Sequence, residues 1–248
     1  ALRQRWVLAD REERRRLVRE GLEQAAVAEN VELRLDDVLL EEVVDLVEWP
    51  VVVTCRLDAD FLDLPPKLLV ESMRVHQRVF PTWETGTESL SPVFLTVSNN
   101  PDGDDATIAT GNARVLSARF SDARFFFAED QKRRLEALGE KLERMQWIRG
   151  LGTMADRQQR LGAVAGRLTQ SVYFDGDHDA ARRAAELCKC DLTSQMVGEF
   201  PKLQGHMGRQ YALRQGEDPK AAAAIEDHYL PRFSGDALPQ TPEGRALA

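Results

Sequence analysis

Four acidic residues in the stretch FDGDHDAARRAAE have the type and spacing that could bind calcium. They occupy positions 1, 3, 5 and 12 of the loop that supplies oxygen ligands to Ca²⁺, and they are Asp175, Asp177, Asp179 and Glu186. The sixth position requires glycine for a sharp turn but holds Ala180, and AARRAAE is strongly helical. Asp179 is therefore interpreted as the N-cap of a helix rather than as a calcium ligand.

The pair His178-Asp179 also matches the two adjacent ligands of HD-type metal phosphohydrolases. Those enzymes need an upstream histidine on a preceding helix, and residues 131–177 contain no histidine. The cysteines do not make a four-ligand zinc site either, because Cys188 and Cys190 form only a C-x-C pair and Cys55 lies far away. The sequence predicts no metal site.

Motifs of a self-sufficient catalytic centre are missing. There is no G-x-x-x-x-G-K-[ST] phosphate loop and no nucleophile elbow, so no catalytic residue is predicted. The formal net charge of −8 disfavours nucleic-acid binding through bulk charge, so RNA binding would need a local basic strip. No apolar run has membrane-spanning length, and the low cysteine count favours a reducing cytoplasm.

The elements that would position functional side chains predict an α+β protein. Helices are predicted over 10–30, 36–49, 64–79, 106–127 and nearly all of the chain after 131, and short strands over 51–57 and 93–99. We therefore predict a mixed α+β domain over residues 1–148 and an all-α domain over residues 149–248.

Several polar residues fall on the apolar faces of these helices. His76 lies in the middle of the apolar arc of helix 64–79, so it should point inward or into a cleft. Asn112 and Arg119 fall within the apolar arc of helix 106–127, and Asp122 is the expected partner of Arg119 at i+3. This set is interpreted as an internal polar bridge, with a polar cleft as the alternative. Arg114 and Arg124 lie off the arc.

The predicted helix 180–200 carries a row of polar residues beside its apolar line. Asp191, Gln195 and Glu199 are spaced i, i+4, i+8, which is typical of a hydrogen-bond ladder between helices or of the rim of a site. Further along, Gly205 and Gly208 interrupt a helical pattern, where each glycine costs about 1 kcal/mol relative to alanine. Close approach of another backbone would offset that loss.

Five collinear stretches carry a family resemblance. They are LVEWPVVV, DADFLDLPPKLLVESMRVHQRVF, GNARVLSARFSDARFFFAED, AAELCKCDLTSQMVGEFPKLQGHMGRQYA and EDHYLPRFSGDALPQTPEG. Together they make the chain similar to the β subunit of the bacterial-type, two-subunit glycyl-tRNA synthetase over nearly its whole length. The chain departs from the family pattern at Cys55-Arg56-Leu57-Asp58, at Ala113 and at Cys188, which leaves the fold assignment intact and gives Ala113 and Cys188 no specific chemical role.

The resemblance implies a division of labour. The α subunit carries the catalytic centre for glycine activation and uses ATP and Mg, the β subunit recognises tRNA(Gly), and the enzyme is a cytoplasmic heterotetramer of two α and two β subunits. No cofactor is expected in this chain. It implies an HD-like helical domain without metal chemistry, and an internal fragment that ends before the anticodon-binding domain. Gly205 and Gly208 would then face a neighbouring helix or an RNA strand.

Four basic residues are the candidates for tRNA contact, namely Arg114, Arg124, Lys189 and Arg209. Two alternative functions stay open at this stage. One is an HD-type metal phosphohydrolase, and the other is a structural module that holds the catalytic subunit without touching RNA.

Overall fold

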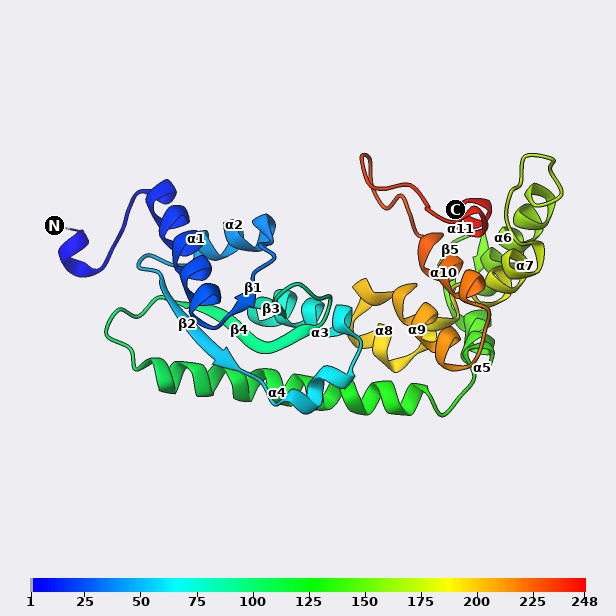
Figure 1. The fold of residues 1–248 in the computed structure, drawn as a ribbon. Coiled ribbons are helices and arrows are strands. Elements are labelled where there is room, and N and C mark those ends of the chain that lie inside the picture. Colours follow the sequence, from blue (N-terminus) through cyan, green and yellow to red (C-terminus); the bar gives the residue numbers. More distant parts are fainter. Residues whose placement is uncertain (1) are drawn as a thin grey trace. The chain divides into compact units, whose positions relative to one another are not determined.

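The computed structural model describes residues 2–248, which form two compact units (Figure 1). The first unit extends to Arg124 and the second runs from Phe125 to Ala248. The division falls inside α4 (Asp105–Asp130), whereas the sequence pattern placed it at residue 148. The difference arises because the last turns of α4 carry Phe127 and Asp130 into the interior of the second unit without any proline or glycine to mark the change.

A four-stranded antiparallel sheet organises the first unit, with the strand order β1-β3-β4-β2. Its strands are β1 (Val31–Glu32), β2 (Val51–Arg56), β3 (Phe80–Glu84) and β4 (Leu90–Ser98). The predicted strands β2 and β4 are confirmed, and they pair in continuous register from Val51 opposite Ser98 to Arg56 opposite Val93. β3 was missed because its five residues include Pro81, which weakens the strand signal.

Two helices cover one face of this sheet, α1 (Arg11–Ala28) and α2 (Asp37–Leu46). Each begins at an aspartate N-cap, since Asp10 and Asp36 both accept hydrogen bonds from two backbone N–H groups of the following turn. Their apolar stripes pack with the strands into one core, in which Leu22, Leu40 and Leu95 are fully buried. In Figure 1 the first part of α4 runs along the opposite side of the sheet.

The predicted helix 64–79 is α3 (Pro66–Ser72) followed by a π-helical turn (Met73–Gln77). The 3₁₀ turns Arg3–Arg5 and Ala59–Asp63 complete the first unit. The wider π turn rotates the residues after Ser72 relative to a regular α-helix, and Val75 is 39% exposed. His76 lies in this turn and is half-buried.

The second unit is mostly helical. Its helices are α5 (Leu135–Gly139), α6 (Met154–Leu168), α7 (His178–Leu187), α8 (Gln195–Glu199), α9 (His206–Arg214), α10 (Pro219–Asp227) and α11 (Pro242–Leu247), with 3₁₀ turns at Glu140–Arg144, Cys190–Thr193 and Pro201–Leu203. It is not all-α, because β5 (Gln146–Ile148) and β6 (Gly152–Thr153) form a small hairpin. Gly150 and Gly152 supply the positive φ angles of that hairpin.

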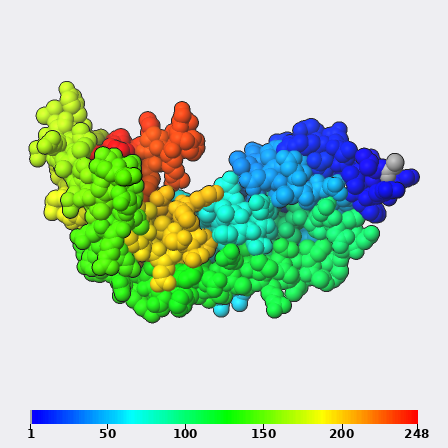
Figure 2. Space-filling model, turned by 180° about the vertical axis from the view of Figure 1, so that it is seen from behind, coloured from blue at the N-terminus to red at the C-terminus, as the bar shows by residue number. Residues whose placement is uncertain are grey.

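α6 and α7 form a projecting pair whose connecting segment stands out in yellow-green in Figures 1 and 2. Val172 and Tyr173 in this segment are 92% and 90% exposed. The N-cap of α7 is Asp177, which accepts from the N–H groups of Asp179 and Ala180, so the assignment of Asp179 as the cap was wrong by two residues. None of the helices described between residues 2 and 248 combines the length and apolar character needed to cross a membrane.

Candidate nucleic-acid interface

The two arginines of α4 that were predicted to contact RNA differ in how firmly the protein holds their guanidinium groups. Both are exposed. Arg124 is anchored within the first unit, where its Nη2 donates to the carbonyl oxygen of Asp60 and its guanidinium lies 4.7 Å from the ring centroid of Phe61. Arg114 has no carboxylate within ion-pair distance among the residues that the structure describes. Arg114 is therefore the less constrained guanidinium of the two.

The predicted inward placement of Arg119 is wrong. The buried apolar residues of α4 form one narrow stripe, Leu116, Phe120, Ala123 and Phe127, and Arg119 and Asp122 are exposed. Asn112 is half-buried and donates to the Ile108 carbonyl one turn earlier, at 2.9 Å. Across residues 2–248 no ion pair joins Arg119 to Asp122, so the expected internal bridge is absent from this helix. The predicted apolar arc of this helix included Arg119, which lies just outside the face that is buried.

Lys189 cannot contact RNA, because it is only 3% exposed. It has a left-handed backbone with φ of 72°, and its Nζ lies 3.6 Å from the ring centroid of Tyr229. Burial lowers the pKa of Lys189 to about 8, and the charge of Arg157 acts in the same direction. Arg209, the other candidate in this unit, is exposed and pairs with Glu226 at 3.2 Å.

We expect Lys189→Met to remove the contribution of this lysine to the pH dependence of the free energy of unfolding. The unfolded lysine, with an ordinary pKa of about 10.5, binds more protons than the folded one between pH 8 and 10.5. Lys189 should therefore contribute a stabilisation that grows with pH across that window, by on the order of 2 kcal/mol, and the wild type should gain that much relative to the variant. The buried thiols of Cys55, Cys188 and Cys190, whose pKa values burial raises, oppose this gain equally in both proteins. Urea unfolding at pH 7.5, 8.5 and 9.5 measures this. The variant should be at least as stable as the wild type at pH 7.5, and an identical pH profile in both proteins would contradict the prediction.

Asp191 explains the two glycines that interrupt the helical pattern. Its carboxylate is fully buried, and Oδ2 accepts from the backbone N–H groups of Gly205 at 2.6 Å and Gly208 at 3.0 Å. Gly205 is the N-cap of α9, with φ of 80°, and Gly208 is its third residue. Asp191 thus caps α9 from a distance, because glycine has no side chain to do so.

The close packing around positions 205 and 208 also leaves no room for a side chain. A Cβ at Gly208 would lie 2.7 Å from Cγ2 of Ile225 in α10 and 3.2 Å from the Asp191 carboxylate. A Cβ at Gly205 would lie 2.5 Å from the Tyr229 ring. Both close neighbours are therefore parts of the same helical unit.

The predicted ladder of Asp191, Gln195 and Glu199 does not form. The helix assumed to carry it ends at Leu187, and Lys189 takes a left-handed backbone conformation before a 3₁₀ turn that contains Asp191. Gln195 and Glu199 lie on the separate helix α8 and are exposed. Because the predicted helix is interrupted after Leu187, the i, i+4, i+8 spacing does not place these three residues on one helix face.

Asp130 is a central residue that the sequence pattern did not single out. It is 4% exposed and accepts from the N–H groups of Gln195 and Met196, both at 2.9 Å, and from the Tyr211 hydroxyl at 2.8 Å. It therefore caps α8 from the end of α4. Burial, together with the neighbouring Asp130 carboxylate, raises the pKa of Tyr211.

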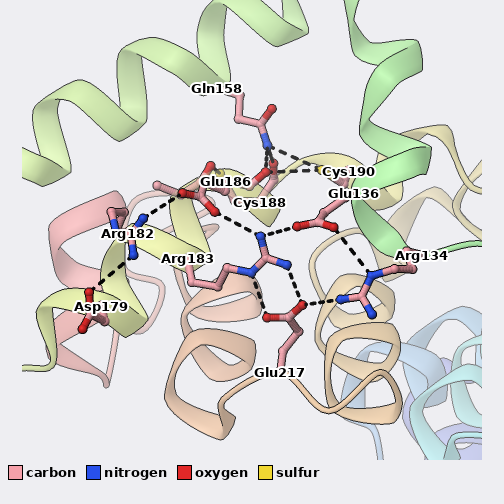
Figure 3. A network of polar contacts seen from close by, with 11 residues as sticks. Arg134, Glu136, Gln158, Asp179, Arg182, Arg183, Glu186, Cys188, Cys190 and Glu217 are labelled. Carbon is pink, nitrogen blue, oxygen red and sulfur yellow. Dashed lines mark hydrogen bonds and ion pairs between the residues drawn. The ribbon is translucent and has the colours of Figure 1, made fainter.

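A second polar network joins α5, α7 and the turn before α10 (Figure 3). Arg183 binds Glu217 through two nitrogens, at 2.8 and 2.6 Å, and it also contacts Glu136 and Glu186. Glu217 receives a further bond from Arg134 at 3.1 Å. These hydrogen bonds raise the pKa of Arg183 and lower that of Glu217, so the network stays ionised.

The His178-Asp179 pair is not arranged as a metal centre. Both residues line a groove of about 650 Å³ between α6 and α7, where the His178 ring packs edge-on against Phe174 and Asp179 pairs with Arg182 at 3.4 Å. Within the described chain, no group of three or more His, Cys, Asp or Glu side chains could hold a metal ion. Cys188 is fully buried, and burial raises the pKa of its thiol to about 12.

Comparison with known proteins assigns the family. The family described as "Glycyl-tRNA synthetase beta subunit" matches residues 1–248. A glycine–tRNA ligase beta subunit of Phenylobacterium zucineum is 48% identical over 240 residues, which are 96% of this chain and 36% of that protein. Its counterpart from Chromohalobacter salexigens is 42% identical over 249 residues, which are 100% of this chain and 36% of that protein.

A third relative of the same name, from Coxiella burnetii, is 44% identical over 234 residues, or 94% of this chain and 33% of that protein. The chain thus spans about a third of the length of these relatives. The resemblance inferred from the five collinear stretches is confirmed over the whole chain. The chain belongs to the glycyl-tRNA synthetase beta subunit family.

Proposed function

We propose that this chain is part of a glycine–tRNA ligase and contributes to tRNA(Gly) recognition and subunit assembly. Aminoacylation, with its ATP and Mg, takes place on a separate α subunit, and the assembled cytoplasmic enzyme contains two α and two β subunits. The observation that carries the proposal is the family match over residues 1–248. The name beta subunit implies an α partner. The buried carboxylates of Asp130 and Asp191 accept hydrogen bonds from helix N-termini, which is a structural role.

Arg114 tests the RNA part of this proposal. In the enzyme assembled with its α subunit, Arg114→Ala should raise the KM for tRNA roughly two- to fivefold, because a surface contact to phosphate is worth up to about 1 kcal/mol. Glycine-dependent ATP–pyrophosphate exchange should be unchanged, and the chain without α subunit should show none. Aminoacylation kinetics at several tRNA concentrations provide the measurement.

Arg119→Ala is the matched control. It removes an exposed arginine from the same helix, but at 100° per residue Arg119 faces about 140° away from Arg114. An unchanged KM in Arg114→Ala would assign α4 to a scaffold role. Exchange activity of the isolated chain would refute the division of labour between the subunits.

A further inference from the structure

The β5–β6 hairpin and the helix that follows it form a basic region in an acidic protein. Residues 144–174 contain five arginines and one acid, Asp156, whereas the whole chain has a net charge of −8. Four of these arginines surround the hairpin. We call Arg144, Arg149, Arg157 and Arg160, together with Trp147, the hairpin patch.

Trp147 holds two of these arginines in place. The Arg157 guanidinium lies 4.6 Å from the Trp147 ring centroid, and that of Arg160 lies 5.5 Å away. Both arginines come from the first turns of α6, while Trp147 comes from β5. Arg160 also donates to the Leu151 carbonyl at 2.9 Å. Stacking on the ring orients the guanidiniums without using their N–H donors, most of which stay available to a ligand.

The arginines of the hairpin patch form no ion pair within the described part of the chain. Many arginines elsewhere are paired with carboxylates, for example Arg11 with Asp45 and Arg34 with Glu88. No carboxylate in the described part of the chain lies within ion-pair distance of any arginine of the patch. The nearby Asp156 carboxylate accepts from the Thr153 N–H at 2.7 Å and the Thr153 hydroxyl at 3.0 Å, in a capping box. These bonds and, to a smaller degree, the charge of Arg160 lower the pKa of Asp156, so this single carboxylate offsets part of the positive charge of Arg160.

The other two arginines need no rearrangement to meet a ligand. Arg144 ends the 3₁₀ turn before β5, Arg149 lies in the hairpin turn, and both are exposed. Three exposed guanidiniums and the half-buried one of Arg157, none of them in an ion pair among the described residues, suit a polyanion with regularly spaced phosphates, because each guanidinium fits a phosphate with two parallel hydrogen bonds.

We propose that the hairpin patch binds the sugar-phosphate backbone of RNA, with Trp147 as the positioning residue for Arg157 and Arg160. The choice of RNA among polyanions rests on the proposed function. The patch is a binding site separate from Arg114 on α4, and it belongs to the helical unit. It fixes the position of the RNA and reads no base sequence.

The test measures the affinity and salt dependence of tRNA binding. Fluorescent tRNA(Gly) transcript is titrated with the ligase assembled with its α subunit, at several salt concentrations. Arg144→Ala/Arg149→Ala should weaken binding roughly five- to tenfold and reduce the slope of log K against log salt by about 1.4 to 1.8, since each of the two phosphate contacts contributes about 0.7 to 0.9. The matched control is Arg5→Ala/Arg232→Ala, which removes two exposed arginines outside the patch.

Trp147 variants test the positioning role. Trp147→Leu should weaken tRNA binding, and Trp147→Phe, which keeps a ring face for the guanidiniums, should restore most of the affinity. If the two variants have equal melting temperatures, a difference between their tRNA affinities cannot come from a difference in stability. If both variants bind tRNA equally well, the positioning role is overturned.

The remaining outcomes separate the two proposals. A wild-type enzyme that does not bind tRNA would defeat the proposed function itself. A wild type that binds, with an unchanged affinity and salt slope in Arg144→Ala/Arg149→Ala or an equal loss in the control, would overturn only the hairpin patch. Loss of co-purifying α subunit with unchanged tRNA affinity would identify the patch as a protein interface and also overturn the proposal.

Discussion

Asp191→Ala lowers the free energy of unfolding of the helical unit by about 3–5 kcal/mol in our expectation. The substitution leaves the buried N–H groups of Gly205 and Gly208 without an acceptor, and each orphaned buried group costs roughly 1–3 kcal/mol. Neither glycine can supply a replacement side chain at the start of α9. Urea unfolding gives the magnitude, and hydrogen exchange gives the location, because the amides of residues 205–208 should lose protection first.

Asp191→Asn is the control for this effect. The amide keeps a carbonyl oxygen that can accept both bonds, so we expect a smaller loss than in the alanine variant, although its NH2 group would replace Oδ1, which has no hydrogen-bond partner among the described residues. Burial raises the pKa of Asp191, and a neutral side chain at this position avoids the desolvation of a charge. Equal losses in the alanine and asparagine variants would show that the two hydrogen bonds are not what stabilises α9.

The second large effect is expected for Asp130→Ala. It removes the acceptor of two N–H groups at the start of α8 and of the buried Tyr211 hydroxyl, and we expect a loss of about 3–5 kcal/mol. Tyr211 is 1% exposed and its ring stacks on Phe127, so no solvent can replace the lost partner without repacking. Thermal unfolding followed by circular dichroism provides the measurement.

Tyr211→Phe separates the contributions to the Asp130 network. It removes one of the three hydrogen bonds and keeps the ring, so the expected loss is only about 1 kcal/mol. The double variant Asp130→Ala/Tyr211→Phe should then be less destabilised than the sum of the two single variants, because the hydroxyl that needs a partner is gone. Strict additivity would mean that Asp130 and Tyr211 act independently.

Local sequence signals predicted much of this fold. Aspartates before α1 and α2, the β-branched run of β2 and the proline at the start of α11 are short-range features, and the corresponding elements form where expected. The mixed α+β architecture followed from them. The resemblance to the synthetase β subunit rested on longer stretches and therefore survived errors in individual helices.

The features that could not be predicted from the sequence depend on contacts between residues far apart along the chain. Asp130 caps a helix that begins 65 positions later, which no local pattern can indicate. Lys189 ends a helix in a left-handed conformation that usually requires glycine, so the break before Asp191 carried no recognisable signal. Arg119 was misplaced because a change of one residue rotates a helical side chain by about 100°, enough to move it from the core to solvent.

Trp147 also gives the helical unit a spectroscopic label of its own. Three of the four tryptophans of the chain, Trp6, Trp49 and Trp83, belong to the first unit, and Trp147 belongs to the second. In a chain whose other tryptophans are replaced by phenylalanine, indole emission comes from the ring beneath Arg157 and Arg160 alone. Its fluorescence then follows the environment of those two guanidiniums in real time, without an attached dye.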